Sequence, residues 1–216
     1  MRLAIAGVVS LLALAAPAQA QQRGGTAGKF DFYVLALSWS PGFCETGGEA
    51  KAREQCAPGA GLGFVVHGLW PQNERGFPSD CGPAGRNPSQ IAMMQASGLF
   101  PSDGLARHQW RKHGTCSGLS PSDYFAATKK ARQAITIPPA FQKAEREQTW
   151  APIDLERAFV AANPGLRADM MSVSCRRNLL QEVRICFTKD LRSFKACQEV
   201  DRSGCRTREI TVSPVR

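Results

Sequence analysis

Short apolar runs, rich in aromatic and β-branched residues, interrupt polar stretches in the first third of the chain. Phe30–Trp39 and Phe64–Leu69 are such runs, and each predicts a buried strand. The stretches Gly47–Gly63 and Pro78–Pro88 are rich in Gly and Pro and predict loops. The pattern of this region is therefore typical of strands joined by long loops.

Helical spacing replaces this pattern in the middle of the chain. Ser120 before Pro121 is the combination of N-cap and first helical residue that favours a helix start. Asp103 is expected to cap another helix. The predicted helices cover Ser89–Ala96, Asp103 to His113, Ser120 to about Ala134, and Ile153–Ala162.

A β-hairpin is predicted towards the end of the chain. The apolar segments Met170–Cys175 and Gln181–Phe187 flank Arg176-Arg177-Asn178, which is typical of a turn. The tail after Asp190 is basic and contains two cysteines. Strands with helices grouped between them, and no repeat or linker, predict an α+β fold in a single domain.

The first twenty residues have the features of a signal peptide. Arg2 is a charged start, Leu3–Ala16 is apolar, and Ala18-Gln19-Ala20 is a small-x-small cleavage signal. The apolar run is shorter than the roughly 20 residues that a membrane-spanning helix needs, although a retained anchor is the alternative. We therefore predict a signal peptide at 1–20 and a mature domain at 21–216, secreted or periplasmic and free of the membrane after cleavage.

The composition is that of an ordinary globular protein with an excess of basic residues. Of 216 residues, 43% are hydrophobic and 21% are charged, which argues against a disordered or fibrous protein. Lys and Arg number 27 against 18 Asp and Glu, a formal net charge of +9. This balance favours a polyanionic partner, either nucleic acid or an anionic surface. A basic tail that only keeps the protein soluble is the alternative.

The cysteines point to disulfides rather than to metal binding. The chain has 8 cysteines and no CxxC pair, unlike a zinc ribbon or a thioredoxin-type redox site. In an oxidising compartment an even number of cysteines indicates a disulfide framework. Many pairings are possible, and the spacing alone does not choose among them.

All three histidines of the chain lie in two short segments. His67 lies in His-Gly-Leu-Trp-Pro-Gln, at the end of the predicted strand where the backbone turns at Gly68. His108 and His113 lie in His-Gln-Trp-Arg-Lys-His-Gly-Thr-Cys, in a predicted helix that Gly114 ends. Any one of these histidines in isolation would more often be a core residue with satisfied hydrogen bonds than a functional one.

Four positions of the predicted helix form one polar stripe with an arc of about 140°. They are His108, Gln109, Lys112 and His113. A soluble helix usually turns such a stripe to water. If the stripe faces the end of the strand that carries His67, imidazoles, an ammonium group and an amide converge on one spot.

That combination suits the cleavage of a phosphodiester. A neutral and a protonated imidazole on opposite sides of the bond can act as general base and general acid. Lys112 and a charged His108 can offset the charge that grows on the phosphoryl oxygens. A 2′-hydroxyl of the substrate would then be the nucleophile, so that RNA is cut, DNA is not, and no cofactor is needed. Zinc is the alternative, but His108 and His113 are five residues apart with no Asp or Glu between them, unlike a helical zinc pair.

At these residues the sequence resembles the ribonuclease T2 family of secreted endoribonucleases. The family signature His-Gly-Leu-Trp-Pro is matched in full by residues 67–71. The signature His-Glu-Trp-x-Lys-His-Gly-Thr-Cys is matched by residues 108–116 except for Gln109, where the family usually has Glu. The likeness extends from about Phe30 to Cys205.

The resemblance implies a fold and a reaction. The fold is α+β, with an antiparallel β-sheet and several helices around a cleft. The reaction is metal-independent cleavage of single-stranded RNA by transesterification to 2′,3′-cyclic phosphates, followed by hydrolysis to 3′-phosphates. Broad base tolerance and a monomer are expected.

The resemblance also assigns roles to the residues of the two signatures. His113 would be the base and His67 the acid, while His108 holds the phosphate and Lys112 stabilises the phosphorane. Trp70 would stack on a base of the RNA. Core packing is the alternative for Trp70. Gln72 and Phe77 are further candidates for contacts with a base, and packing within the loop is the alternative for Phe77.

Gln109 is the one departure from the signatures. Gln keeps the shape and the hydrogen-bonding capacity of Glu but cannot carry charge or move a proton. We expect an active enzyme with a loss on the order of 10–10³-fold, typical of one positioning or electrostatic group. A secreted RNA-binding or host-interacting protein with weakened catalysis is the alternative.

The resemblance further suggests how the cysteines pair. It implies Cys81–Cys116, which ties the loop after the first signature to the end of the second. It also implies a nested arrangement of Cys175–Cys205 around Cys186–Cys197. Cys44 and Cys56 remain as the fourth pair.

Overall fold

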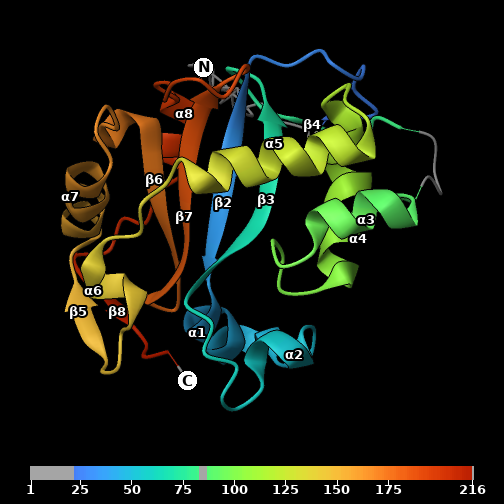
Figure 1. Ribbon diagram of the computed structural model, residues 1–216. Helices are drawn as coiled ribbons and strands as arrows, with labels where there is room; N and C mark the ends of the chain where they lie inside the picture. Colours follow the sequence, from blue (N-terminus) through green and yellow to red (C-terminus); the bar gives the residue numbers. More distant parts are fainter. Residues whose placement is uncertain (1–21, 83–86, 216) are drawn as a thin grey trace, which may run out of the picture.

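The computed structural model describes residues 22–82 and 87–215 (Figure 1). The predicted signal peptide at 1–20 lies outside the described residues. No helix in the described part of the chain combines the length and the apolar character that crossing a membrane requires.

A six-stranded sheet occupies the middle of the protein (Figure 1). Across the sheet the strands follow the order β3 (Phe64–Gln72), β2 (Phe32–Trp39), β7 (Leu179–Thr188), β8 (Ile210–Val212) and β5 (Gln148–Trp150). A further strand, β6 (Met171–Arg176), also pairs with β7. All pairings are antiparallel except that of β7 with β8, which is parallel and has one residue pair in register. Two short strands, β1 (Gln22–Arg23) and β4 (Pro78–Ser79), form a separate parallel pair.

Helices and helical turns surround this sheet. They are α1 (Ser40–Phe43), η1 (Cys44–Gly48), α2 (Arg53–Cys56), α3 (Gln90–Ala96), α4 (Asp103–Lys112), η2 (Gly114–Cys116), α5 (Pro121–Gln133), α6 (Pro139–Gln142), α7 (Pro152–Ala162), η3 (Ala168–Met170) and α8 (Gln198–Arg202). In Figure 1, α5 crosses in front of the strands, while α3 and α4 lie beyond β3. The predicted α+β class with a largely antiparallel sheet is confirmed.

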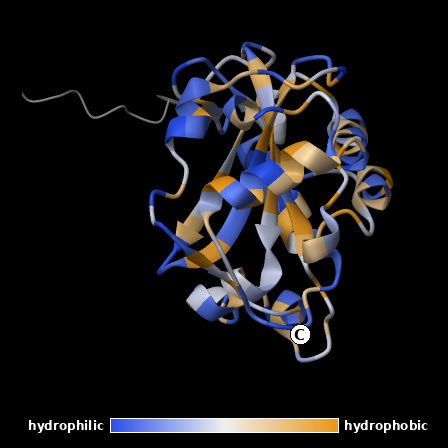
Figure 2. Ribbon diagram, turned by 90° about the vertical axis from the view of Figure 1, so that its left-hand side faces the viewer, coloured by the Kyte–Doolittle hydropathy of each residue, from blue (hydrophilic) through white to orange (hydrophobic). Residues whose placement is uncertain are grey.

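The central strand β2 explains why the sheet is covered on both faces. All eight residues of β2 are buried. Successive side chains of a strand point to opposite faces. Tyr33, Leu35 and Leu37 join the main hydrophobic core, whereas Phe32 and Val34 join a smaller cluster on the other face. Figure 2 shows the apolar residues concentrated in the strands and in the helix faces that cover them.

The smaller cluster lies on the face of the sheet opposite to the main hydrophobic core. It consists of Phe32, Val34, Cys186, Cys197 and Val200, with Trp70 packed against it. The larger core on the opposite face takes the helix side chains of α5, α6 and α7. One face of the sheet thus serves stability, and the other presents polar side chains from β3 and β7.

The strand that carries His67 is longer than predicted. The prediction ended it at Leu69, with a backbone turn at Gly68, but β3 runs to Gln72. Pro71 is accommodated because β3 is an edge strand of the sheet, where a missing backbone donor is tolerated. His67 therefore lies within a strand and not at its end.

Several local predictions were wrong in detail. Ser102, and not Asp103, caps α4, because its hydroxyl accepts the N–H of Leu105. The helix ends at Lys112 with His113 as its C-cap, directly before Gly114 as predicted; a Cβ on Gly114 would lie 2.4 Å from the ring of Trp110, so glycine permits close packing there. The predicted loop 47–63 contains α2 and part of η1. The hairpin turn is only Arg177-Asn178, both with positive φ, which is the geometry of a tight two-residue turn.

Four disulfides hold the segments around the sheet. They are Cys44–Cys56, Cys81–Cys116, Cys175–Cys205 and Cys186–Cys197, the pairs that the family resemblance implies. Cys186–Cys197 fixes α8 to β7.

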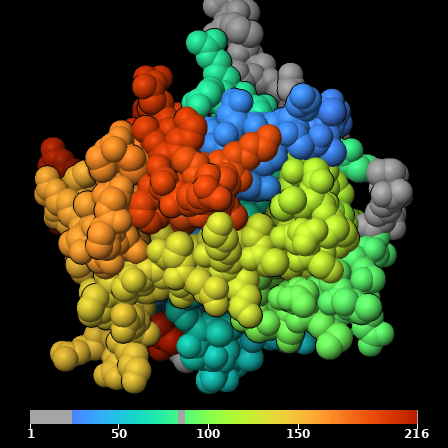
Figure 3. Space-filling model, turned by 45° about the horizontal axis from the view of Figure 1, so that its top comes forward, coloured from blue at the N-terminus to red at the C-terminus, as the bar shows by residue number. Residues whose placement is uncertain are grey.

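In Figure 3, C-terminal segments (red and orange) pack beside N-terminal segments (blue), which agrees with the hydrogen bond from the ammonium of Lys189 to the carbonyl of Gly28.

Candidate active site

Two residues of the polar stripe of α4 face the sheet and not the solvent. Gln109 is 1% exposed and His113 is 6% exposed, while Lys112 is half-buried and His108 is exposed. A hydrogen bond from the hydroxyl of Tyr124 to the carbonyl of Leu69 connects α5 to β3 beside the helix. The sequence left open whether this stripe faces the strand that carries His67. In the structure it does.

A β-bulge turns His67 towards this stripe. Gly68 pairs with Ala36 and Val66 pairs with Leu37, so that His67 has no partner on β2. Val66 and Leu69 both contribute to the main core, which leaves His67 and Gly68 together on the opposite face. Bulges commonly redirect a side chain next to an active site.

The histidines of both signatures line one pocket of about 300 Å³. His67, His108, Lys112 and His113 contribute to its walls, together with Gln109, Trp70, Gln72 and Phe77. Every site residue named from the sequence is thus brought to the same pocket. Arg184, Val34 and Val200 complete it, and sequence reasoning had not singled these three out.

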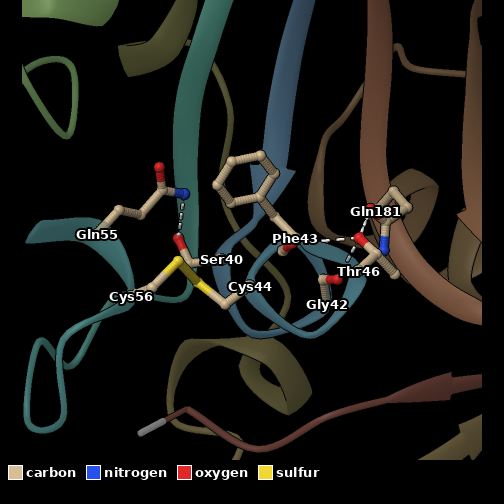
Figure 4. Close-up of a disulfide and its surroundings, with 8 residues drawn as sticks. All are labelled: Ser40, Gly42, Phe43, Cys44, Thr46, Gln55, Cys56 and Gln181. Atoms are coloured by element: carbon tan, nitrogen blue, oxygen red, sulfur yellow. Dashed lines mark hydrogen bonds between the residues drawn. A yellow bond between two sulfur atoms is a disulfide. The ribbon is translucent and has the colours of Figure 1, made fainter. Parts of the chain in front are cut away.

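A larger pocket of about 810 Å³ continues the cleft on the other side of His67. The two pockets share His67, His108 and Arg184. Phe43 and Gln55 line the larger one, and Figure 4 shows how the Cys44–Cys56 disulfide joins the segments that carry them. Gln55 donates a hydrogen bond to the Ser40 hydroxyl at 3.0 Å, which fixes this wall.

His113 has the environment of a neutral imidazole. Burial, followed by the charges of Lys112, His67 and His108, lowers the pKa of His113 to about 3. Its ring stacks on Trp70 at a centroid distance of 5.2 Å, and its Nδ1 has no hydrogen-bond partner among the described residues. At neutral pH this ring can therefore accept a proton.

His67 has the opposite environment, because a carboxylate contacts it directly. Its Nδ1 is hydrogen-bonded and ion-paired to Glu182 on β7, and Glu182 is also bound by Arg184 at 2.9 Å. Burial raises the pKa of Glu182, but the hydrogen bond and charge of His67, together with Arg184, outweigh it and lower that pKa to about 2. Glu182 is therefore ionised at any working pH.

His108 does not carry the charge that the sequence analysis expected of it. Burial, followed by the charges of Lys112 and Arg111, lowers the pKa of His108. In the unliganded protein at neutral pH this imidazole is therefore uncharged, and it can offer a phosphate an N–H donor. The ammonium of Lys112 lies in the same pocket and supplies the positive charge.

Gln109 holds the indole of Trp70. Its Oε1 accepts the Trp70 Nε1–H at 2.8 Å. A Cβ on Gly68 would lie 2.3 Å from that Oε1 and 2.4 Å from Nε1, so only glycine leaves room for this contact. Because Trp70 in turn stacks on His113, the amide of Gln109 orients the His113 ring indirectly.

The candidates for base contacts lie around the same pocket. Trp70 is half-buried, and besides His113 it has the guanidinium of Arg184 5.4 Å from its ring centre. Phe77 lies 6.4 Å from the His113 ring, and Gln72 is buried in the pocket wall. That Trp70 stacks on a base of the RNA stays a prediction. The structure adds that the Trp70 ring packs against the His113 ring.

Glu182 and Arg184 were missed at the level of the sequence. A signal existed, since the predicted strand Gln181–Phe187 places these two charged residues on one face, with apolar Val183 and Ile185 on the other. No group of three or more His, Cys, Asp or Glu side chains within residues 22–82 and 87–215 is arranged to hold a metal ion.

Comparison with known proteins agrees with this site. A sequence model of the Ribonuclease T2 family matches residues 30–197. A ribonuclease of Aeromonas hydrophila is 37% identical over 198 residues, covering 89% of this chain and 88% of the relative. Ribonuclease DdI of Dictyostelium discoideum is 28% identical, covering 95% and 96%. The structure of an RNase-related protein from Calystegia sepium matches the fold with a TM-score of 0.65 at 20% identity, covering 86% of this chain and 97% of that protein.

Sequence matches, fold and pocket agree on one class of protein, the endonucleases that cleave RNA. Both the family match and the Aeromonas relative span most of the chain. The protein belongs to the Ribonuclease T2 family.

Proposed function

We propose that the protein cleaves single-stranded RNA without a metal ion, first to a 2′,3′-cyclic phosphate and then to a 3′-phosphate. The observation that carries this proposal is the contrast between two imidazoles in one pocket. His113 is held neutral by burial, and His67 is paired with a carboxylate. Two titratable groups whose environments differ in this way are suited to be base and acid.

In the first step His113 takes the proton from the 2′-hydroxyl of the substrate. The 2′-oxygen attacks the phosphorus atom, and His67 gives a proton to the departing 5′-oxygen. Burial lowers the pKa of His113 most, and the positive charges around it lower it further. A bound phosphodiester anion opposes the effect of these charges, and it makes this imidazole a stronger base than in the unliganded protein. In the second step a water molecule replaces the departed nucleotide, and the two histidines exchange roles.

The charge that develops on the phosphoryl oxygens is met by Lys112 and His108. Both line the same pocket as His67 and His113. Donors that are already in place before the reaction stabilise such charge without reorganising. Arg184 lines both pockets and can contact the RNA backbone on either side of the scissile bond.

The amide of Gln109 is sufficient for an active enzyme. Its observed contact is the hydrogen bond from Trp70, which an amide oxygen accepts as well as a carboxylate does. This contact reduces the loss of about 10–10³-fold that the sequence analysis expected of Gln109. We now expect Gln109→Glu to change kcat by less than about tenfold, and Gln109→Leu, which removes the acceptor, to lower it by about 10–100-fold. A rise of a thousandfold in Gln109→Glu would instead favour the alternative, an RNA-binding protein with weakened catalysis.

The experiment that tests the proposal uses short RNAs, matched DNAs and mass detection of the products in the presence of EDTA. We expect cyclic phosphate ends from RNA, their later conversion to 3′-phosphates, and no cleavage of DNA. Loss of activity in EDTA, or cleavage of DNA at a similar rate, would reject the mechanism.

We further propose that the protein is exported and acts as a monomer. The sequence of residues 1–20 supports export, as do the four disulfides, because such bonds persist in oxidising compartments. N-terminal sequencing of the mature protein tests cleavage after Ala20. Light scattering in solution tests the monomer, and a mass of twice the mature chain would reject it.

A further inference from the structure

Glu182 is the only acidic residue among residues 22–82 and 87–215 that is buried. In the described part of the chain it is also the only acidic residue that lines either pocket of the cleft. The family signature usually has Glu at the position of Gln109 on α4, so this chain lacks that carboxylate. The negative charge in the walls of the cleft therefore comes from Glu182 on β7.

Both oxygens of the Glu182 carboxylate are held. Oε1 contacts the Nδ1 of His67 and accepts the Ser38 hydroxyl at 3.4 Å. Oε2 accepts two hydrogen bonds from Arg184, from Nε at 3.0 Å and from Nη2 at 2.9 Å. The arginine thus fixes the carboxylate, and the carboxylate fixes one nitrogen of the imidazole.

This contact sets the orientation of His67. With Nδ1 engaged, Nε2 is the ring nitrogen left for a substrate, and a carboxylate partner keeps the hydrogen on Nδ1. Nε2 is therefore the nitrogen that can face the scissile bond.

We propose that Glu182 is a positioning residue that acts through His67. It orients the imidazole with Nε2 towards the scissile bond, so that His67 can act as the acid for the departing 5′-oxygen. This inference rests on the proposed function, because it assigns a partner to the acid of that reaction. Glu182 does not contact the reacting atoms in this account.

The test compares Glu182→Gln with the unchanged protein on two substrates. One is a dinucleotide, whose departing 5′-oxygen needs a proton. The other is uridine 3′-(4-nitrophenyl phosphate), whose aryl oxide departs without one. We expect kcat on the dinucleotide to fall about 100-fold, and kcat on the aryl ester to fall less than about fivefold.

Two further variants separate positioning from folding. Glu182→Asp keeps the carboxylate but shortens the side chain, so it should lower kcat on the dinucleotide less than Glu182→Gln does, and still more than it lowers kcat on the aryl ester. This variant also keeps the test valid if Glu182→Gln fails to fold. Asp154→Asn removes a carboxylate from an ion pair with Arg157 on α7, outside both pockets. It should leave both activities unchanged.

The outcomes separate the inference from the proposed function. Equal losses on the two substrates would overturn the role of Glu182. If Glu182→Gln cleaves the dinucleotide like the unchanged protein, the inference also fails while the proposed function stands. If the unchanged protein forms no cyclic phosphate, the proposed function itself fails.

Discussion

Replacing His113 by Gln should change how the stability of the protein depends on pH. His113 is 6% exposed, and its pKa is lowered from 6.5 to about 3, mainly by burial. In the unfolded chain this imidazole takes up a proton below pH 6.5, whereas in the folded protein it stays neutral until about pH 3. The unfolded state therefore binds one more proton in this window, and the folded state loses stability as the pH falls through it.

The size of this pH dependence follows from the one extra proton that the unfolded state binds. The free energy of unfolding should rise by about 1.4 kcal/mol for each pH unit between pH 3 and pH 6.5 and stay flat above that range. Over the whole window this amounts to roughly 4–5 kcal/mol. Gln has no titrating group, so this contribution is absent from His113→Gln, while all other titrating groups are common to both proteins.

The assay is urea unfolding of both proteins at several pH values from 4 to 8, with the disulfides intact. The difference between the two unfolding free energies should grow in favour of the unchanged protein from pH 4 to about pH 6.5. The slope of this difference against pH does not depend on how much the substitution destabilises the fold at any one pH. Parallel curves for the two proteins would refute the claim that the candidate base is buried in its neutral form.

Two further substitutions test how the pocket is held together. Replacing Cys81 and Cys116 by Ser opens a loop with a sequence separation of 35 residues. The substitution should lower the free energy of unfolding by about 3–4 kcal/mol. Urea unfolding measures this loss, and a loss below about 1 kcal/mol would contradict the prediction. Gly68→Ala would place a Cβ 2.3 Å from Oε1 of Gln109. It should lower kcat by 10-fold or more through the displaced indole of Trp70, and unchanged kinetics would show that the contact is dispensable.

Much of the fold could be predicted because its signals are local. The N-cap Ser120 with Pro121, and the apolar run of β2, specify their elements through nearest neighbours alone. The extension of β3 through Pro71 was not predictable in the same way. It depends on β3 lying at the edge of the sheet, and this position is set by pairing with a distant strand.

The candidate site was predictable as a set of residues but not as a set of environments. The histidine segments could be found from their composition and spacing. The bulge at His67, the partner Glu182 and the burial of Gln109 all depend on contacts between β2, β3, β7 and α4. The expected charge on His108 was wrong for the same reason, because burial and cationic neighbours of the folded protein set its pKa.

The central claim is that His67 and His113 act together on one phosphodiester bond. The most direct measurement is kcat/KM on a dinucleotide for His67→Ala, for His113→Ala and for the double variant. Each single substitution should lower the rate by about 10²–10⁴-fold, and the double variant should lose little more than the worse single variant, because groups that act as a unit are not additive. Losses that multiply in the double variant would contradict the claim.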